Sequence, residues 1–225
     1  MHKENHIVIV ACRVMEPELE WARRGKDHVE IRYLDQGLHR TPQDMAGLVQ
    51  EQIDQATVYA HRIILGYGLC SNGIVGVTAR GQGLIVPRCH DCIALFLGSP
   101  TFYKEVFEAR PGTYYLTPGW VAEKKDPLGI VEEDYTLRVG RETAFWVMEE
   151  ELKHYSHIAL INNGVTDVGP LRERAMENAR IFKKDYEEIR GSMDYFKKIM
   201  QGPYTEENFL FIKNSSEITQ EMFFE

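Results

Sequence analysis

Short apolar runs recur along the sequence, and they constrain the fold more than any other feature of the chain. Each run is bounded by residues that break strands, such as Gly, Pro or Asn, and a helical pattern follows it. Continuous rather than alternating apolar runs are typical of strands that are buried on both faces of a sheet. We therefore expect seven strands: HIVIVA at 6–11, VEIRYLD at 29–35, HRIILGYG at 61–68, GLIVP at 83–87, TYYLTPG at 113–119, HIALINN at 157–163 and NFLFIK at 208–213.

Helical patterns fill the segments between these runs. The segment 41–60 has Thr41 as a plausible N-cap and Pro42 at the first helical position. A second helix begins at or near Cys92 and breaks between Gly98 and Pro100, where a third begins. Two more helices are expected over 140–156 and 169–200, the last one long and solvated on one side. The apolar residues of the first helix share one face at helical spacing: Met45, Leu48, Val49, Ile53 and Ala56.

The alternation of strands and helices predicts the fold class. It indicates an α/β protein with a mostly parallel sheet, helices on both faces and three layers, in the manner of a Rossmann-like fold. We expect a single domain over 1–225, with a C-terminal strand pair at about 208–224. This pair either closes one edge of the sheet or covers a neighbouring subunit, so a homo-oligomer is one alternative.

The charge balance and the N-terminal sequence limit the partners and the cellular compartment that we expect for the protein. Thirty-four acidic and twenty-six basic residues give a net charge of -8, which disfavours nucleic acid and anionic membranes as partners. The first apolar run is too short for a signal peptide or a spanning helix, so we expect a cytoplasmic protein. In a reducing compartment the four cysteines are thiols, metal ligands or catalytic groups rather than disulfides.

All four cysteines fall where an expected strand ends or a helix begins. Cys12 ends the first run, Cys70 follows the third, Cys89 follows the fourth, and Cys92 opens the next helix. In open parallel sheets, ligands bind outside the carboxyl ends of the strands. If the three strands are neighbours, the four sulfurs converge at that edge.

The stretch PRCHDC at 87–92 is the densest part of this pattern. Thiolates suit zinc and iron–sulfur clusters, so we expect Cys12, Cys70, Cys89 and Cys92 to bind zinc or a 4Fe-4S cluster, with His90 as an alternative ligand. A thioredoxin-like redox pair, a structural zinc and plain buried cysteines are the competing interpretations. The wide spread of Cys12 and Cys70 favours a site at the sheet edge over a self-contained zinc knuckle.

Three further stretches supply candidate binding residues. In GYGLCSNGIVG at 66–76, glycines permit positive φ and close backbone approach, so the loop either binds a carboxylate or phosphate or is only a tight turn. Trp120 ends TYYLTPGW and is a candidate pocket wall, and Asn163 in INNGVTDVG is a candidate hydrogen-bond donor. The cofactor-binding candidates are Gly68, Ser71, Asn72, Gly73, Trp120 and Asn163.

The motifs GYGLCSNG, PRCHDCIALFLGS, TYYLTPGW and FLFIKNSSEI together resemble the bacterial and archaeal family catalogued as domain of unknown function 1638. The resemblance spans nearly the whole chain. Members of that family occur in anaerobes and methylotrophs, near genes for corrinoid-dependent methyl transfer. The resemblance therefore implies one-carbon metabolism and a corrinoid methyltransferase protein as a partner, but no particular reaction.

Two functions follow from the sequence. The first is a metal-dependent or iron–sulfur-dependent enzyme, a transferase or lyase, that acts on a small molecule in one-carbon or corrinoid-linked methyl metabolism. Its Cys-ligated centre lies at the carboxyl edge of the sheet, with an open coordination position for chemistry. The alternative is a non-catalytic metal carrier or accessory protein of a methyltransferase system, since no general acid or base is evident beside the cysteines.

Overall fold

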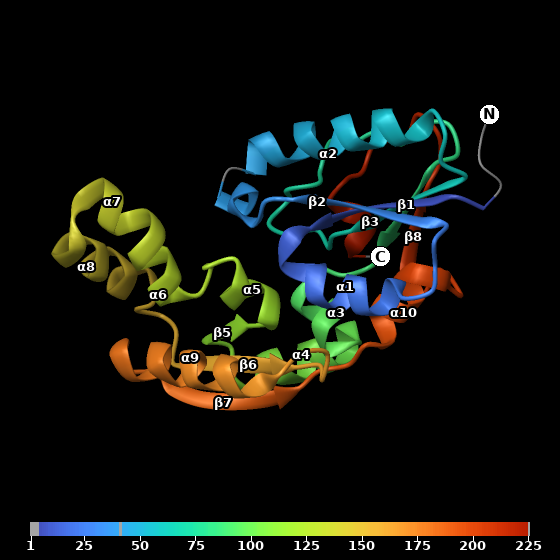
Figure 1. Cartoon of the computed structure of the whole chain (residues 1–225). Coiled ribbons are helices and arrows are strands. Elements are labelled where there is room, and N and C mark those ends of the chain that lie inside the picture. The colour runs from blue at the N-terminus through green and yellow to red at the C-terminus, as the bar shows by residue number, and fades with distance from the viewer. Residues whose placement is uncertain (1–4, 41, 225) are drawn as a thin grey trace.

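The strands of the chain form two sheets rather than one. The structure is a computed structural model that describes residues 5–40 and 42–224, so the expected N-cap Thr41 lies outside the described residues. The first sheet has the order β2-β1-β3-β4-β8, and the second has the order β5-β6-β7 (Figure 1). Among the described strands, β8 alone runs antiparallel to its neighbour. The α/β class and the mostly parallel pairing are confirmed, whereas the single sheet is corrected to two.

All seven expected strands are present. The first sheet holds β1 (Ile7–Cys12), β2 (Val29–Leu34), β3 (Arg62–Gly66), β4 (Leu84–Pro87) and β8 (Phe209–Ile212). β1 and β4 are buried along their whole length, as their continuous apolar runs predict. The second sheet holds β5 (Thr113–Leu116), β6 (His157–Asn162) and β7 (Asp185–Arg190).

The strand β7 replaces the middle of the long helix expected over 169–200. That segment forms α9 (Val168–Ile181), then β7, then α10 (Asp194–Gln201). Lys183 has a φ of 55° between α9 and β7, where the helix has ended. The sequence DYEEIR favours a helix by propensity, but pairing with β6 and ion pairs to Arg110 and Arg172 stabilise it as an edge strand.

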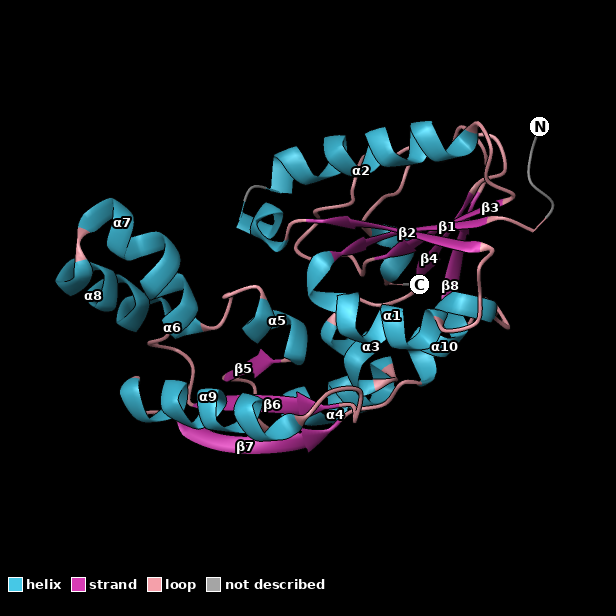
Figure 2. Cartoon of the chain, viewed as in Figure 1, coloured by secondary structure: helices cyan, strands magenta, loops and turns pink. Residues whose placement is uncertain are grey.

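Helices separate and cover the two sheets (Figure 2). α2 lies over one face of the first sheet, and α1, α3 and α10 lie between the sheets. The remaining helices, α4 to α9, follow α3 in the chain, and among them α6 to α8 form a projecting lobe with its own small core. The bounds are α1 (Glu16–Arg23), α2 (Pro42–Thr57), α3 (Ile93–Leu97), α4 (Pro100–Ala109), α5 (Pro118–Ala122), α6 (Pro127–Ile130), α7 (Thr136–Val139) and α8 (Arg141–Glu151).

Local signals explain where the helices near the site begin and end. Gly98 takes a φ of 82° and ends α3, and the Ser99 side chain accepts a hydrogen bond from the Phe102 amide at the start of α4. The expected break between Gly98 and Pro100 is confirmed. On α2, Leu48 departs from the expected buried face because it is 36% exposed, whereas the other four residues are fully buried: Met45, Val49, Ile53 and Ala56.

The prediction of a C-terminal strand pair at about 208–224 is correct for one strand and wrong for the other. β8 pairs with β4 and closes that edge of the first sheet. The expected second strand is instead a single bridge between Thr78 and Glu217, followed by the 3-10 helix η4 (Glu221–Phe223). None of the helices in the described residues combines the length and apolar character that a membrane span requires.

Candidate functional site

The order of the first sheet brings the cysteine-bearing strand ends together. β1, β3 and β4 are consecutive in the sheet, so Cys12, Cys70 and Cys89 follow three adjacent parallel strands at one edge. β2 lies on one side of β1 and β3 on the other, so the strand order reverses between β1 and β3. The crevice at such a switch point is where open α/β sheets bind ligands. Cys12 and Cys70 flank that point.

Backbone contacts hold the loop after β3 against the loop after β4. The Leu69 amide donates to the Cys89 carbonyl at 2.9 Å, and the Cys70 amide donates to the His90 carbonyl at 3.0 Å. Gly68 lies so close to Cys89 that a Cβ on it would be 2.9 Å from the Cys89 Sγ. These contacts place Cys70 beside the start of α3, where Cys92 is the N-cap.

The turn that carries Cys70 is strained. Cys70, Ser71 and Asn72 have φ angles of 47°, 55° and 67°, so three consecutive residues with side chains are left-handed. The sequence predicts that glycines supply positive φ in this loop. Gly76 does so with a φ of 90°, whereas Gly68 and Gly73 do not. Such strain costs about 1–3 kcal/mol per residue and clusters at functional sites. Backbone hydrogen bonds from the Cys70 amide to the His90 carbonyl and from the Gly73 amide to the Cys70 carbonyl hold the turn in this conformation.

All four thiols are free and buried. Burial raises the pKa of Cys12 to about 12, and it raises the pKa of Cys89 well above its ordinary value. The pKa of Cys92 is raised well above its ordinary value by a hydrogen bond with Cys70 and by burial. Cys70 interacts electrostatically with each of the other three thiols, so it is the centre of the group.

The charged groups that act on these thiols are acids. Asp91 raises the pKa of Cys89 and Cys92, and Asp35 and Glu123 raise the pKa of Cys12. Within residues 5–40 and 42–224, no three His, Cys, Asp or Glu side chains form a group that could hold a metal ion. The thiols are therefore gathered at one edge, but within the described residues they are not arranged as a finished metal site.

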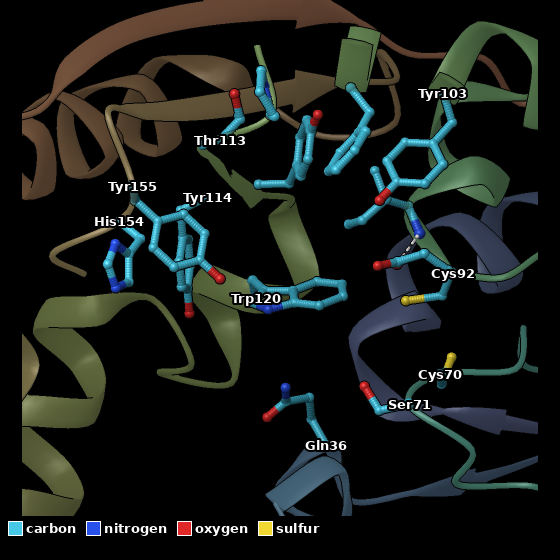
Figure 3. Close-up of a pocket in the computed structure, with 16 residues that line it drawn as sticks. Gln36, Cys70, Ser71, Cys92, Tyr103, Thr113, Tyr114, Trp120, His154 and Tyr155 are labelled. Carbon is cyan, nitrogen blue, oxygen red and sulfur yellow. Dashed lines mark hydrogen bonds between the residues drawn. The ribbon is translucent and has the colours of Figure 1, made fainter. Parts of the chain in front are cut away.

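A cavity of about 520 Å³ opens beside Cys70 and Cys92 (Figure 3). It lies between the carboxyl edge of the first sheet and the segment from β5 to α5. Ser71 and Trp120, both expected at a binding site, also line it. The other lining residues are Gln36, Asp91, Ile93, Tyr103, Phe107, Pro111, Gly112, Thr113, Tyr114, Tyr115, His154 and Tyr155.

Asp91 is the acidic side chain of this cavity. Its Oδ1 accepts a hydrogen bond from the Ile93 amide at 2.9 Å, which fixes the carboxylate at the start of α3. The Tyr103 hydroxyl lies against Asp91, and burial and this carboxylate raise the pKa of Tyr103. Asp91 is half-buried, so its carboxylate faces the cavity without being sealed from it.

The other expected site residues lie elsewhere. His90 is exposed, and its ring packs on Phe224 with centroids 4.4 Å apart, not among the thiols. Asn72 is exposed, and Gly73 lies against Met45 of α2. Asn163 lines a different cavity at the carboxyl ends of β6 and β7. Its side-chain amide donates to Glu18, 3.5 Å away.

Several residues that line the cavity were not predicted from the sequence as site residues. Tyr103 and Phe107 lie one turn apart on α4, a helix that has no fully buried residue. An apolar pair at helical spacing on a half-exposed helix is a usable signal for a pocket wall. Tyr155 and His154 precede β6 and carry no comparable pattern, so only the fold brings them to the cavity.

A sequence profile of one protein family matches residues 33–200. The chain belongs to this family, described as "Protein of unknown function (DUF1638)". Cys70, Cys89 and Cys92 lie inside the part that matches the DUF1638 family, and Cys12 lies outside it. No curated protein and no solved structure matches the chain.

Proposed function

We propose that the chain is an enzyme that acts on a small molecule in the cavity beside Cys70 and Cys92. Its reactive centre is zinc or a 4Fe-4S cluster bound by cysteine thiolates at the carboxyl edge of the first sheet. One observation carries this proposal: three adjacent strands deliver cysteines to one edge, and the central thiol, Cys70, lines a cavity. Cys89, Cys92 and Cys12 are the further ligands.

The chemistry of the donor set supports a soft metal. The charged side chains that raise the pKa of Cys12, Cys89 and Cys92 are acids, and a metal ion or cluster supplies the positive charge that stabilises thiolates. Binding requires the thiols to lose protons and to turn toward one another, because they do not form a finished site. When bound, a metal with an open position supplies a Lewis acid next to the cavity.

Two competing functions have less support. A thioredoxin-like pair needs a thiol with a lowered pKa, whereas the pKa of Cys92 and Cys89 is raised. A carrier that releases its metal to a partner needs accessible ligands, whereas Cys12 and Cys89 are 1% and 2% exposed. A cavity with half-exposed polar and aromatic side chains favours an enzyme over a carrier.

The metabolic setting is proposed on the family resemblance alone. It comprises one-carbon or corrinoid-linked methyl metabolism in the cytoplasm, with a corrinoid methyltransferase protein as a partner. Co-purification of tagged chain from an anaerobically grown host tests the partner, and a corrinoid absorption band in the eluate is the expected result.

Anaerobic purification followed by elemental analysis and an absorption spectrum tests the metal centre. A brown protein with about four irons per chain indicates a cluster, and a colourless protein with one zinc indicates a mononuclear centre. We expect Cys70→Ser to lose the metal. Asn72→Ala is the matched control, because it changes the same left-handed turn and removes no thiol.

The chelation kinetics separate an enzyme from a carrier. We expect the metal to resist moderate chelation and to stay bound in the presence of an apo partner. A chain that contains neither metal in stoichiometric amount, and folds unchanged in Cys70→Ser, contradicts the proposal.

A further inference from the structure

Aromatic rings dominate the walls of the cavity beside the thiols. Six aromatic side chains other than His154 line it: Tyr103, Phe107, Tyr114, Tyr115, Trp120 and Tyr155. They come from α4, β5, α5 and the segment before β6, which are brought together only by the fold. Aromatic faces carry negative electrostatic potential, so several of them around one space form a site for a cation.

The rings stand at steep angles to one another. Tyr114 and Tyr155 are 5.5 Å apart with their planes at 63°, and Tyr103 and Tyr115 are 6.1 Å apart at 68°. Figure 3 shows Tyr114 and Tyr155 on one side of Trp120 and Tyr103 on the other. A flat ligand needs two parallel faces between which to stack, and this arrangement does not offer them. Rings that line a cavity on several sides, with neither of these two pairs parallel, suit a rounded group better than a flat one.

The charged groups of the cavity also favour a cation. Asp91 supplies a carboxylate, and the lining residues that the structure describes include no Lys or Arg. His154 is the one basic side chain among them, and it is exposed beside Tyr155. An anionic ligand would meet a carboxylate without a compensating cation, whereas a cation gains from the carboxylate and from the rings together. The net charge of -8 also attracts cations to the protein over a longer range.

We propose that this cavity binds the methylated ammonium or sulfonium group of a small molecule. The positive group lies among Trp120, Tyr155 and Tyr103, and Asp91 balances its charge. The assignment of this molecule as the substrate rests on the proposed function, because the thiols of Cys70 and Cys92 form the neighbouring wall. Binding itself depends on the rings and the carboxylate and does not require a metal.

Calorimetry with choline and its uncharged isostere 3,3-dimethylbutan-1-ol tests this proposal on the whole chain. The two probes have the same shape and differ in charge, so an aromatic cage with a carboxylate should prefer choline by about tenfold or more. Equal affinity for both probes means a merely apolar pocket and overturns the proposal. Absence of choline binding overturns it as well.

Substitutions at the cavity mouth identify the groups that bind the cation. Tyr155 is 37% exposed, so its replacement should leave the fold intact. We expect Tyr155→Leu to weaken choline binding about fivefold and Tyr155→Phe, which keeps the ring, to leave it nearly unchanged. Asp91→Asn keeps a side-chain oxygen that can accept the hydrogen bond from the Ile93 amide, and it should weaken the binding of choline but not of the isostere. Choline affinity unaffected by both Tyr155→Leu and Asp91→Asn contradicts the proposal.

A thiol variant separates this inference from the proposed metal centre. Cys89→Ser changes a proposed ligand whose side chain does not line the cavity, so it should retain the preference for choline even when it has lost its metal. Loss of metal with retained choline preference supports both assignments. Choline preference in a wild-type chain that never contains metal supports the cation site and contradicts the metal centre. A chain that contains metal but binds both probes equally supports the metal centre and contradicts the cation site.

Discussion

Gly68 and Cys89 are in direct contact across the loops that follow β3 and β4. A Cβ on Gly68 would lie 2.8 Å from the Cys89 carbonyl oxygen and 2.9 Å from its Sγ. The loop that contains Gly68 also carries Cys70, whose amide donates a hydrogen bond to the carbonyl of His90, the residue after Cys89. The absence of a side chain at position 68 therefore sets the separation of Cys89 from Cys70.

We expect Gly68→Ala to push Cys89 away from Cys70. Over-packing of this kind destabilises a protein by about 1–3 kcal/mol, and the displaced thiol should also lower the metal content. Chemical denaturation and elemental analysis measure the two effects. Gly47→Ala is the control, because Gly47 lies in α2 with nothing within 4 Å of an added Cβ. It should stabilise the chain by up to about 1 kcal/mol and leave the metal content unchanged.

The buried acid Glu18 predicts a pH dependence of stability. It is 0% exposed on α1, its Oε2 has no hydrogen-bond partner among the described residues, and burial raises its pKa to about 8. Between about pH 4.5 and pH 8, the folded chain keeps a proton that the unfolded chain releases. The free energy of unfolding should therefore fall as pH rises through this window, by up to about 1.4 kcal/mol per pH unit.

The Glu18→Gln variant isolates this contribution. Gln has no proton to lose, so the variant should match the wild type near pH 5 and exceed its stability near pH 8. Urea denaturation of both proteins at pH 5, 6, 7 and 8 gives the comparison. Parallel pH profiles for the two proteins would show that Glu18 is ionised in the folded chain.

Accessibility to the cavity predicts which thiols react first. Cys70 and Cys92 line the cavity, whereas Cys12 and Cys89 do not and are nearly inaccessible. Iodoacetamide treatment of metal-free folded protein, followed by peptide mass spectrometry, should label Cys70 and Cys92 before Cys12 and Cys89. The metal-loaded protein should be protected at all four. Labelling of Cys12 first would contradict the placement of the cavity.

Much of the fold was predictable because its strands are strongly apolar. Continuous runs such as that of β1 identify buried strands without help from other parts of the chain. β7 was missed because an exposed edge strand rich in Glu resembles a helix, and only its pairing with β6 distinguishes the two. The division into two sheets depends on which strands pair, and pairing between distant segments leaves no local pattern.

The candidate site, too, was predictable where it depends on single strands and unpredictable where it depends on which strands pair. Cys12, Cys70 and Cys89 could be placed at strand ends because the strands themselves were predictable. Their adjacency follows from the strand order, which only the structure shows. Asn163 was expected to bind a ligand, but β6 belongs to the second sheet, so Asn163 lies at a cavity other than the one beside the thiols. The sequence predicted positive φ at the glycines of this loop, whereas Cys70, Ser71 and Asn72 have it as well as Gly76.

X-ray absorption at the iron or zinc edge of anaerobically isolated protein tests the central claim most directly. The account predicts a metal whose first shell contains sulfur at about 2.3 Å, and a sulfur signal that is lost with the metal in Cys70→Ser. A first shell of nitrogen and oxygen alone, or a full sulfur signal retained in Cys70→Ser, would contradict it.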